Sequence, residues 1–484
     1  MKRIALGSLL LAISTTGSAA DLTLAAVFGD HMVLQRGQPI TVWGSAAPAA
    51  PVTLELAGQQ GSATADASGA WSIELPPLPA SGPFTLTAHS GSAALTRSDL
   101  MIGDLWLASG QSNMVLALTA STEWAATRTT GIKPGIRVCK LPGTPSLTPT
   151  ETYVRDIPWD LFDPSRVGAF SAVAGYFALT VQPALPGKEQ GKEPLTIGVL
   201  EGASGGTMAE QWTPEAALRA ADPQSRTFAL REKSLAKVAA DPQTKVGGSD
   251  AGAAALYNGT IHGVRHLKFA GVLWYQGEAN SRSPDDYRPR LTTLIKSWRE
   301  LFAEPELPFI IVQLPHFGLP KDDGWMRVQE AQRLVAHDLK LPLVVTIDQG
   351  SAITIHPPNK AEVGRRAGLA ALQHVYHQAV NGTSPQPTAL HFTGATAAID
   401  FSDDLVVNEA AISGFELAGH DQAFVPASAS LSGRTITLSA AGITQPEAVR
   451  YLWVHSPAAV TLAGISGLPV GPFRFGGAAP QATP

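Results

Sequence analysis

The 484-residue sequence has little cysteine, little charge and no basic run, and each shortage excludes a class of protein. Its one cysteine, Cys139, leaves no partner for an intramolecular disulfide and no second thiolate for a CxxC metal site. Charged residues make up 15% of the chain, and 35 basic against 40 acidic residues give a net charge of −5. This balance carries no electrostatic footprint for nucleic acid, so we expect no such partner.

Long hydrophobic runs are also missing. No stretch reaches the roughly 18 apolar residues that span a bilayer, so we expect no association with a membrane through a spanning segment. A shorter apolar run, Ile4 to Ile13, follows Lys2 and Arg3 and precedes Ser18-Ala19-Ala20. This order is typical of a signal peptide. We predict that residues 1–20 are cleaved and that the mature chain is periplasmic or extracellular.

Residues 21–98 have the alternation of β-structure. Short runs in which apolar and polar residues alternate are separated by Gly, Pro, Ser and Ala clusters; the runs are Val52 to Leu56, Trp71 to Leu75 and Phe84 to Ala88. Strands with one buried face produce this pattern. We predict a small N-terminal domain of β-sandwich type.

Residues 99–392 change to a pattern of strands and helices. After Asp104 to Ala108 come continuous apolar runs, typical of strands buried on both faces of a parallel sheet: Leu195 to Leu200, Gly271 to Tyr275, Phe309 to Gln313 and Leu343 to Ile347. Predicted helices alternate with them: Phe170 to Gln182, Tyr287 to Phe302, Met326 to His337 and Lys360 to Val375. This alternation predicts a three-layer α/β core. Residues 120–165 fit no period, and we interpret them as loops.

Residues 393–484 return to alternating, strand-like segments: Ala397 to Phe401, Arg434 to Ser439, Ala448 to Val454 and Ala459 to Leu462. The predicted architecture is therefore an α/β core flanked by N-terminal and C-terminal regions of β-sandwich type.

Two serines compete as the nucleophile. Ser112 lies in Gly110-Gln-Ser-Asn-Met114, directly after a predicted strand, where a helix N-terminus can stabilise a developing oxyanion. The alternative role of such a serine is a helix N-cap. Ser204 lies in Gly202-Ala-Ser-Gly-Gly206, which matches the G-x-S-x-G nucleophile elbow. That motif arises easily in a chain rich in Gly and Ser, and its loop could instead donate N–H groups to another nucleophile.

The candidate partners follow other predicted strands. His356 lies beyond the last parallel strand, where its imidazole could act as a general base. Glu278, in Trp274 to Asn280, could orient that imidazole, while the amides of Gln276 and Asn280 could donate to an oxyanion. Each signal is weak alone, because a loop histidine and a polar turn are common.

The sequence favours no metal or cofactor. His262 and His266 are spaced i, i+4, but no third ligand follows at the spacing of a zinc site.

Several blocks together resemble a known family. The chain is similar to bacterial sialate O-acetylesterase-like proteins, within the SGNH hydrolase group of carbohydrate esterases. The resemblance runs over nearly the whole mature chain, in the blocks Val27 to Arg36, Gly103 to Met114, Gly205 to Trp212, Leu256 to Gly259, Trp274 to Asn280, His356-Pro357 with Asn359-Lys360, Gly414 to Gly419, Ala448 to Trp453 and Pro469 to Phe473.

This resemblance implies a flavodoxin-like SGNH core and a serine esterase that removes acetyl groups from carbohydrates without a cofactor. Ser112 matches the nucleophile of the family and His356 its base. Gly205 and Gly206 match the oxyanion-hole block, to which Ser112 also contributes an N–H group, so that Ser204 becomes scaffold. In related esterases the glutamate matching Glu278 is taken to orient the histidine.

Two positions depart from the pattern of the family. Thr354 stands where members often carry an aspartate two residues before the histidine, and Ser204 stands where they usually carry tryptophan. The first departure leaves the third triad member open between Glu278, Asp348 in reserve, and a Ser–His pair alone. It also leaves open a non-catalytic carbohydrate-binding protein with a decayed site, and a lipid or thioester hydrolase is a third alternative. The sugar and the oligomeric state are open as well.

Overall fold

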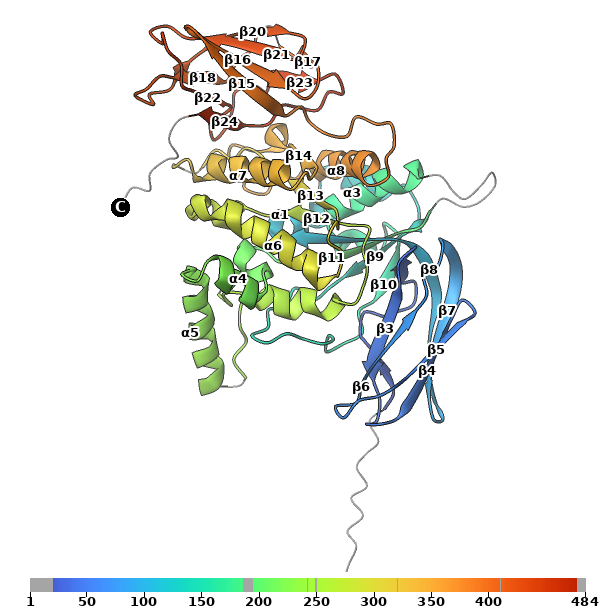
Figure 1. Ribbon diagram of the computed structural model, residues 1–484. Helices are drawn as coiled ribbons and strands as arrows, with labels where there is room; N and C mark the ends of the chain where they lie inside the picture. Colours follow the sequence, from blue (N-terminus) through green and yellow to red (C-terminus); the bar gives the residue numbers. More distant parts are fainter. Residues whose placement is uncertain are drawn as a thin grey trace, which may run out of the picture.

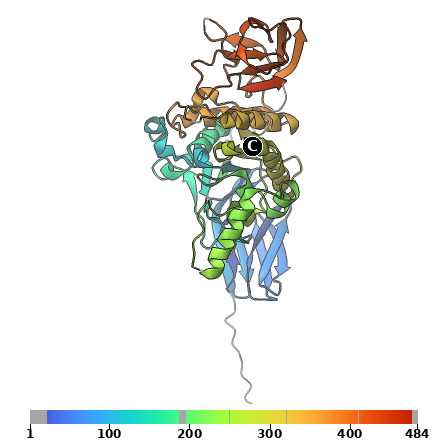
Figure 2. The ribbon, with the colours of Figure 1, turned by 90° about the vertical axis from the view of Figure 1, so that its left-hand side faces the viewer.

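The computed structural model describes residues 21–185, 195–241, 243–248, 250–319, 321–409 and 411–476. The predicted signal peptide, residues 1–20, lies outside these residues. An N-terminal β region, a mixed α/β core and a C-terminal β region follow one another along the chain, and the two β regions lie at opposite ends of the molecule (Figures 1 and 2). Among the described residues, no helix combines the length and the apolar character that crossing a membrane requires.

The core is built on one sheet of parallel strands with an antiparallel strand at its edge. In spatial order the strands are β10 (Trp159–Phe162), β9 (Lys133–Lys140), β11 (Ile197–Ala203), β8 (Ala93–Gly110), β12 (Gly271–Tyr275), β13 (Phe309–Val312) and β14 (Leu343–Val344). All are parallel to their neighbours except β10, which runs antiparallel to β9. The order β11-β8-β12-β13-β14 is the 2-1-3-4-5 order of flavodoxin-like sheets, which bind ligands where the order reverses beside the first strand.

Burial on both faces explains the continuous apolar runs of these strands. Every residue of β11, β12 and β13 is buried. The main helices are α3 (Ala172–Val181), α6 (Tyr287–Leu301), α7 (Gly324–Asp338) and α8 (Lys360–His374). Helix α3 packs against α8 and α6 packs against α7, and strands β12 and β13 run between α6 and the α3–α8 pair (Figure 1).

Strand β8 joins the N-terminal region to the core. Its first half pairs with β7 (Ser81–Ser90), while its second half lies between β11 and β12. The other strands of the N-terminal region are β1 (Thr23–Leu24), β2 (Val33–Gln35), β3 (Ile40–Ser45), β4 (Pro51–Leu56), β5 (Gln59–Thr64) and β6 (Ala70–Leu75). The expected boundary between residues 98 and 99 therefore falls inside one continuous strand.

The C-terminal region contains three small antiparallel sheets. They are β15 (Pro387–Thr393), β16 (Thr396–Phe401), β21 (Thr435–Ser439) and β20 (Ser428–Ser432); β17 (Leu405–Val407) with β23 (Leu462–Gly464); and β19 (Val425–Pro426), β18 (Phe415–Ala418), β22 (Ala448–Tyr451) and β24 (Phe473–Gly476). The expected boundary between residues 392 and 393 falls inside β15. This region contacts the core where Phe317 N–H donates to the carbonyl of His455 at 2.9 Å.

The prediction that residues 120–165 are loops is wrong in part, because β9 and β10 lie within them. A buried arginine conceals the apolar character of β9. Arg137 is 5% exposed, and its guanidinium donates to Asp99 and to the carbonyl of His31. Four further helices were not predicted from the sequence: α4 (Glu215–Ala221), α5 (Arg226–Ala240) and the short α1 (Ser112–Val115) and α2 (Trp124–Thr127).

The N-terminal region packs directly on the sheet at a glycine, and this contact can be tested. A Cβ at Gly198 in β11 would lie 2.6 Å from Cβ of Val33 in β2. We predict that Gly198→Ala lowers the free energy of unfolding by about 1–3 kcal/mol, because the two strands must move apart. Denaturant titration monitored by tryptophan fluorescence measures the change. The control is Gly247→Ala, whose new Cβ has no heavy atom within 4 Å; equal midpoints for the two variants would contradict the packing.

Candidate active site

Ser112 is held at the carboxyl edge of the sheet by the turn after β8. Gly110 has φ 139°, and a Cβ there would lie 2.0 Å from the carbonyl oxygen of Tyr275 in β12. The next residue, Gln111, donates its N–H to that carbonyl at 3.0 Å. Only glycine allows so close an approach with this backbone conformation. The turn therefore places Ser112 as the first residue of α1, beside the point where the strand order reverses.

Ser112 and His356 form a hydrogen-bonded pair. Ser112 Oγ lies 2.8 Å from Nε2 of His356, which comes from the loop between β14 and α8. For the hydroxyl to donate, the imidazole must be neutral with its proton on Nδ1. Partial burial and the nearby charge of Lys360 lower the pKa of His356, which favours that form. The backbone N–H of His356 donates to Thr354 Oγ1 at 3.2 Å, so the side chain of Thr354 contacts the backbone of the histidine.

The loop after β11 adjoins Ser112. A Cβ at Gly205 would lie 3.6 Å from Cβ of Ser112, whereas one at Gly206, with φ 70°, would meet nothing within 4 Å. The lack of side chains leaves the backbone of this loop open to a ligand beside the serine. Ser204 lies elsewhere: its Oγ faces Gly248, whose added Cβ would lie 3.3 Å from it.

The structure contradicts the prediction that Glu278 orients His356. Glu278 Oε1 accepts a hydrogen bond from Asn113 Nδ2 at 2.6 Å, and the side chain is 5% exposed. Burial raises the pKa of this carboxyl group. Within the part of the chain that the structure describes, no carboxylate forms a hydrogen bond or ion pair with His356. Because Gly277 turns the chain after β12, Glu278 enters the interior under α1 and does not reach the imidazole.

The reserve acid, Asp348, is also engaged elsewhere. Arg366 of α8 donates to both of its carboxylate oxygens, at 2.6 and 2.5 Å. This bidentate pair anchors the start of the loop that carries His356 to α8, and it corrects the prediction that Asp348 could complete a triad.

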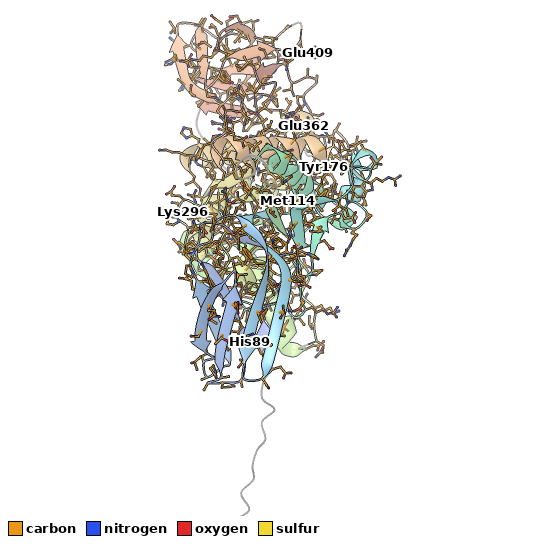
Figure 3. The ribbon with its side chains drawn as sticks, turned by 90° about the vertical axis from the view of Figure 1, so that its right-hand side faces the viewer. His89, Met114, Tyr176, Lys296, Glu362 and Glu409 are labelled. Atoms are coloured by element: carbon orange, nitrogen blue, oxygen red, sulfur yellow. The ribbon has the colours of Figure 1, made fainter. Side chains whose placement is uncertain are left out.

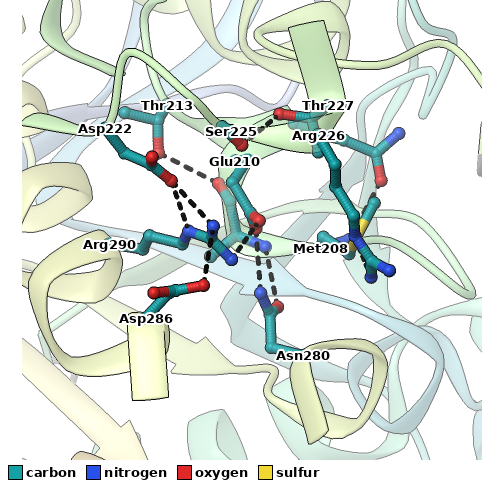
Figure 4. A network of polar contacts seen from close by, with 12 residues as sticks. Met208, Glu210, Thr213, Asp222, Ser225, Arg226, Thr227, Asn280, Asp286 and Arg290 are labelled. Atoms are coloured by element: carbon teal, nitrogen blue, oxygen red, sulfur yellow. Dashed lines mark hydrogen bonds and ion pairs between the residues drawn. The ribbon is translucent and has the colours of Figure 1, made fainter. Parts of the chain in front are cut away.

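The amides of Gln276 and Asn280 are used inside the protein, which corrects their predicted place in the oxyanion hole. Gln276 Nε2 donates to the carbonyl of Thr207 at 3.0 Å and to Asn280 Oδ1 at 2.7 Å. Asn280 donates to Glu210 at 2.8 Å and accepts from Ala209 N–H at 3.1 Å (Figure 4). Buried polar groups need such partners. These amides therefore hold in place the segment that directly follows Gly205 and Gly206 in the chain.

Sequence reasoning missed several residues that build this site. Gln111 Oε1 accepts from Gln276 Nε2 at 3.1 Å, and the side chain of Asn113 lies between Glu278 and Lys360. The only signal for them was their place beside Ser112 and His356 in the two motif blocks. No group of three or more His, Cys, Asp or Glu side chains suited to a metal ion gathers among the described residues.

A buried ion pair supports the same segment and yields a test. Arg290 of α6 lies 2.8 Å from Glu210, which is fully buried, and also pairs with Asp222 and Asp286 (Figure 4). We predict that Arg290→Met lowers the free energy of unfolding by about 3–5 kcal/mol, because it leaves a buried carboxylate without its partner. The control, Arg288→Met, breaks an exposed pair with Asp338 and should cost about 1 kcal/mol or less. Denaturant unfolding of both variants measures the difference, and equal losses would contradict the argument.

Comparisons with known proteins identify the family of this chain. Residues 102–363 match the family model described as carbohydrate esterase, sialic acid-specific acetylesterase. Sialate O-acetylesterase of Rattus norvegicus is 26% identical, with 93% of this chain and 92% of the relative covered. The Homo sapiens protein of the same name is 28% identical, with 73% and 71% covered. A crystal structure of a carbohydrate acetylesterase from Xanthomonas citri is 30% identical with a TM-score of 0.83, and covers 94% of this chain and 99% of its own. The chain is thus a carboxylic ester hydrolase, and it belongs to the carbohydrate esterase family of sialic acid-specific acetylesterases.

Proposed function

We propose that the protein is a secreted serine esterase that removes O-acetyl groups from carbohydrates through an acetyl-Ser112 intermediate. The observation that carries this proposal is the 2.8 Å contact between Ser112 Oγ and His356 Nε2 at the carboxyl edge of the sheet. The names of its relatives, which are sialate and carbohydrate acetylesterases, support acetylated sugars as the substrate class. The signal peptide that the sequence predicts for residues 1–20 supports secretion.

The proposed reaction has two half-reactions. Ser112 Oγ attacks the acetyl carbonyl carbon while its proton passes to Nε2 of His356. The tetrahedral intermediate then expels the sugar oxygen, which takes that proton, and the acetyl group remains on Ser112. A water molecule repeats the sequence, with His356 again as base, and releases acetate.

Backbone groups are the proposed oxyanion hole. The N–H of Ser112, in the first turn of α1, and those of Gly205 and Gly206 are proposed to donate to the oxygen of the acetyl carbonyl. No backbone hydrogen bond within the described residues uses these three N–H groups as donors. Free N–H groups held in place before the reaction need no reorganisation to stabilise the oxyanion.

The proposed catalytic group is a Ser112–His356 pair without a third acid, because Glu278 and Asp348 bond elsewhere. Ser204 stands in place of the usual tryptophan of the family, so we propose no particular sugar. The two flanking regions, about residues 21–98 and 393–484, we propose to be sandwich-type modules.

The nucleophile assignment can be tested with two serine variants. We predict that Ser112→Ala lowers kcat for p-nitrophenyl acetate by a factor on the order of 10⁶, because no other hydroxyl lies within reach of His356 Nε2 among the described residues. Ser204→Ala should keep a rate close to that of the wild type, since its hydroxyl faces Gly248. Acetate release measures both, and trapping of an acetyl group on Ser112 by mass spectrometry identifies the intermediate.

The opposite result, an active Ser112→Ala and an inactive Ser204→Ala, would overturn the assignment. A wild-type protein that binds acetylated glycans but releases no acetate from any ester would indicate the non-catalytic alternative. Comparable rates on acetyl and octanoyl esters would indicate a lipid or thioester hydrolase. A screen of acetylated sialoglycan, xylan and xyloglucan would then identify the sugar.

The pKa of His356 predicts the pH dependence. His356 must be neutral to accept the proton of Ser112, and burial together with Lys360 lowers its pKa. We therefore expect the acid limb of kcat/KM to have its midpoint below about 6.5, the ordinary value for histidine, with full activity retained above it. Rates of acetate release between about pH 5 and pH 8 measure the limb. A midpoint above the ordinary value would contradict the assigned environment.

A further inference from the structure

Lys360 occupies a position where a lysine is unfavourable. It is the first residue of α8 and is fully buried, whereas cations stabilise the opposite end of a helix. Burial lowers the pKa of its ammonium group to about 7, against the opposing effect of Glu278. The helix gains nothing from a cation at its first residue and burial opposes the charge, so the presence of this lysine needs another explanation.

The contacts of Lys360 lead to both reacting residues. Its Nζ donates to Asn113 Oδ1 at 2.7 Å, and Asn113 Nδ2 donates to Glu278 at 2.6 Å and to the carbonyl of Ile355 at 3.0 Å. The orientation of the amide follows from its partners, because an ammonium group can only donate and a carbonyl can only accept. The side chain of Asn113 thus uses both its ends to tie three segments of chain together.

These segments carry the reacting groups. Asn113 directly follows Ser112, and Ile355 directly precedes His356. The hydrogen bond from Asn113 to the carbonyl of Ile355 therefore fixes the separation between the nucleophile and the base, because each partner is the chain neighbour of a reacting residue. Since a displacement of about 1 Å in an active site can cost about 100-fold in rate, the support of Asn113 is critical.

Three titratable side chains lie near Lys360 among the described residues. Glu278, three residues after β12, faces it across the Asn113 amide and has one carboxylate oxygen without a partner among the described residues. The ring of Tyr275 in β12 lies 5.5 Å from Nζ. His356, on the loop before α8, is near enough for the charge of Lys360 to lower its pKa. Glu278 thus keeps the cation in place, and the cation acts on the base.

We propose that Lys360 is a positioning residue: through Asn113 it holds the Ser112 turn against the loop that carries His356. This inference rests on the proposed function, because it assumes that Ser112 and His356 react.

The experiment compares Lys360→Met with wild type and Ser112→Ala, using p-nitrophenyl acetate. We expect Lys360→Met to lower kcat by about 10–100-fold with little change in KM, since the substrate does not touch this side chain. The acid limb of kcat/KM should move to higher pH, because the cation beside His356 is gone. A purely structural role would not move this limb.

A double variant separates positioning from charge balance. Lys360→Met alone leaves Glu278 buried without its counter-charge, so it lowers the melting temperature. Glu278→Gln with Lys360→Met should restore the melting temperature but not kcat. The control is Lys296→Met on α6, which removes one exposed charge at the side of the molecule, away from Met114 beside Asn113 (Figure 3). This control should match the wild type in every measurement.

The outcomes distinguish the two proposals. If Lys360→Met, or the double variant, has the kcat and the acid limb of the wild type while Ser112→Ala is inactive, Lys360 is not a positioning residue and the proposed function stands. If Ser112→Ala remains active, the proposed function itself fails.

Discussion

The close approach of the Gly110 backbone to the carbonyl of Tyr275 is the contact on which the site depends. It brings β8 and β12 together at their carboxyl ends and bends the chain so that Ser112 begins α1. Because β8 lies between β11 and β12, the loops that follow all three strands converge on this serine. His356 completes the arrangement from the loop after β14, the edge strand of the same sheet. A side chain at position 110 would push the two strands apart and disperse these groups.

Because these loops converge at one edge of the sheet, many polar groups there are buried. The hydrogen bonds among these groups determine which of them remain available for other interactions. Gln276, Asn280 and Glu278 come directly after β12, beneath the loops. These side chains are almost inaccessible to water, so their polar groups need partners in the protein. Their bonds to Thr207, Glu210 and Asn113 rigidify the segments on either side of Ser112. Residues with the chemistry of donors and acids thus act as scaffold, and backbone N–H groups remain for the proposed oxyanion hole.

The strands of the core could be predicted from this sequence more readily than the roles of its polar side chains. The apolar run from Gly271 to Tyr275 gives β12 directly, since burial on both faces leaves a simple pattern. Strand β9 was not predicted, because its Arg137 is buried and bonds to carbonyl groups from distant parts of the chain. No local sequence pattern indicates such partners. The Ser112–His356 pair could be predicted from two motif blocks. The partners of Glu278 could not, because they depend on which way the chain turns at Gly277, where φ is 150°.

A catalytic pair without a carboxylate is suited to the leaving group of the proposed reaction. In a triad the acid stabilises the imidazolium ion and makes the histidine a stronger base. Here partial burial and Lys360 lower the pKa of His356. A less basic imidazole takes the proton of Ser112 less readily, but the imidazolium that forms is a stronger acid. The alkoxide of a sugar is a poor leaving group that departs only as it is protonated, so a stronger general acid favours the second half of the acyl transfer. The environment of His356 therefore weakens proton abstraction from Ser112 and strengthens proton donation to the sugar oxygen in the proposed reaction.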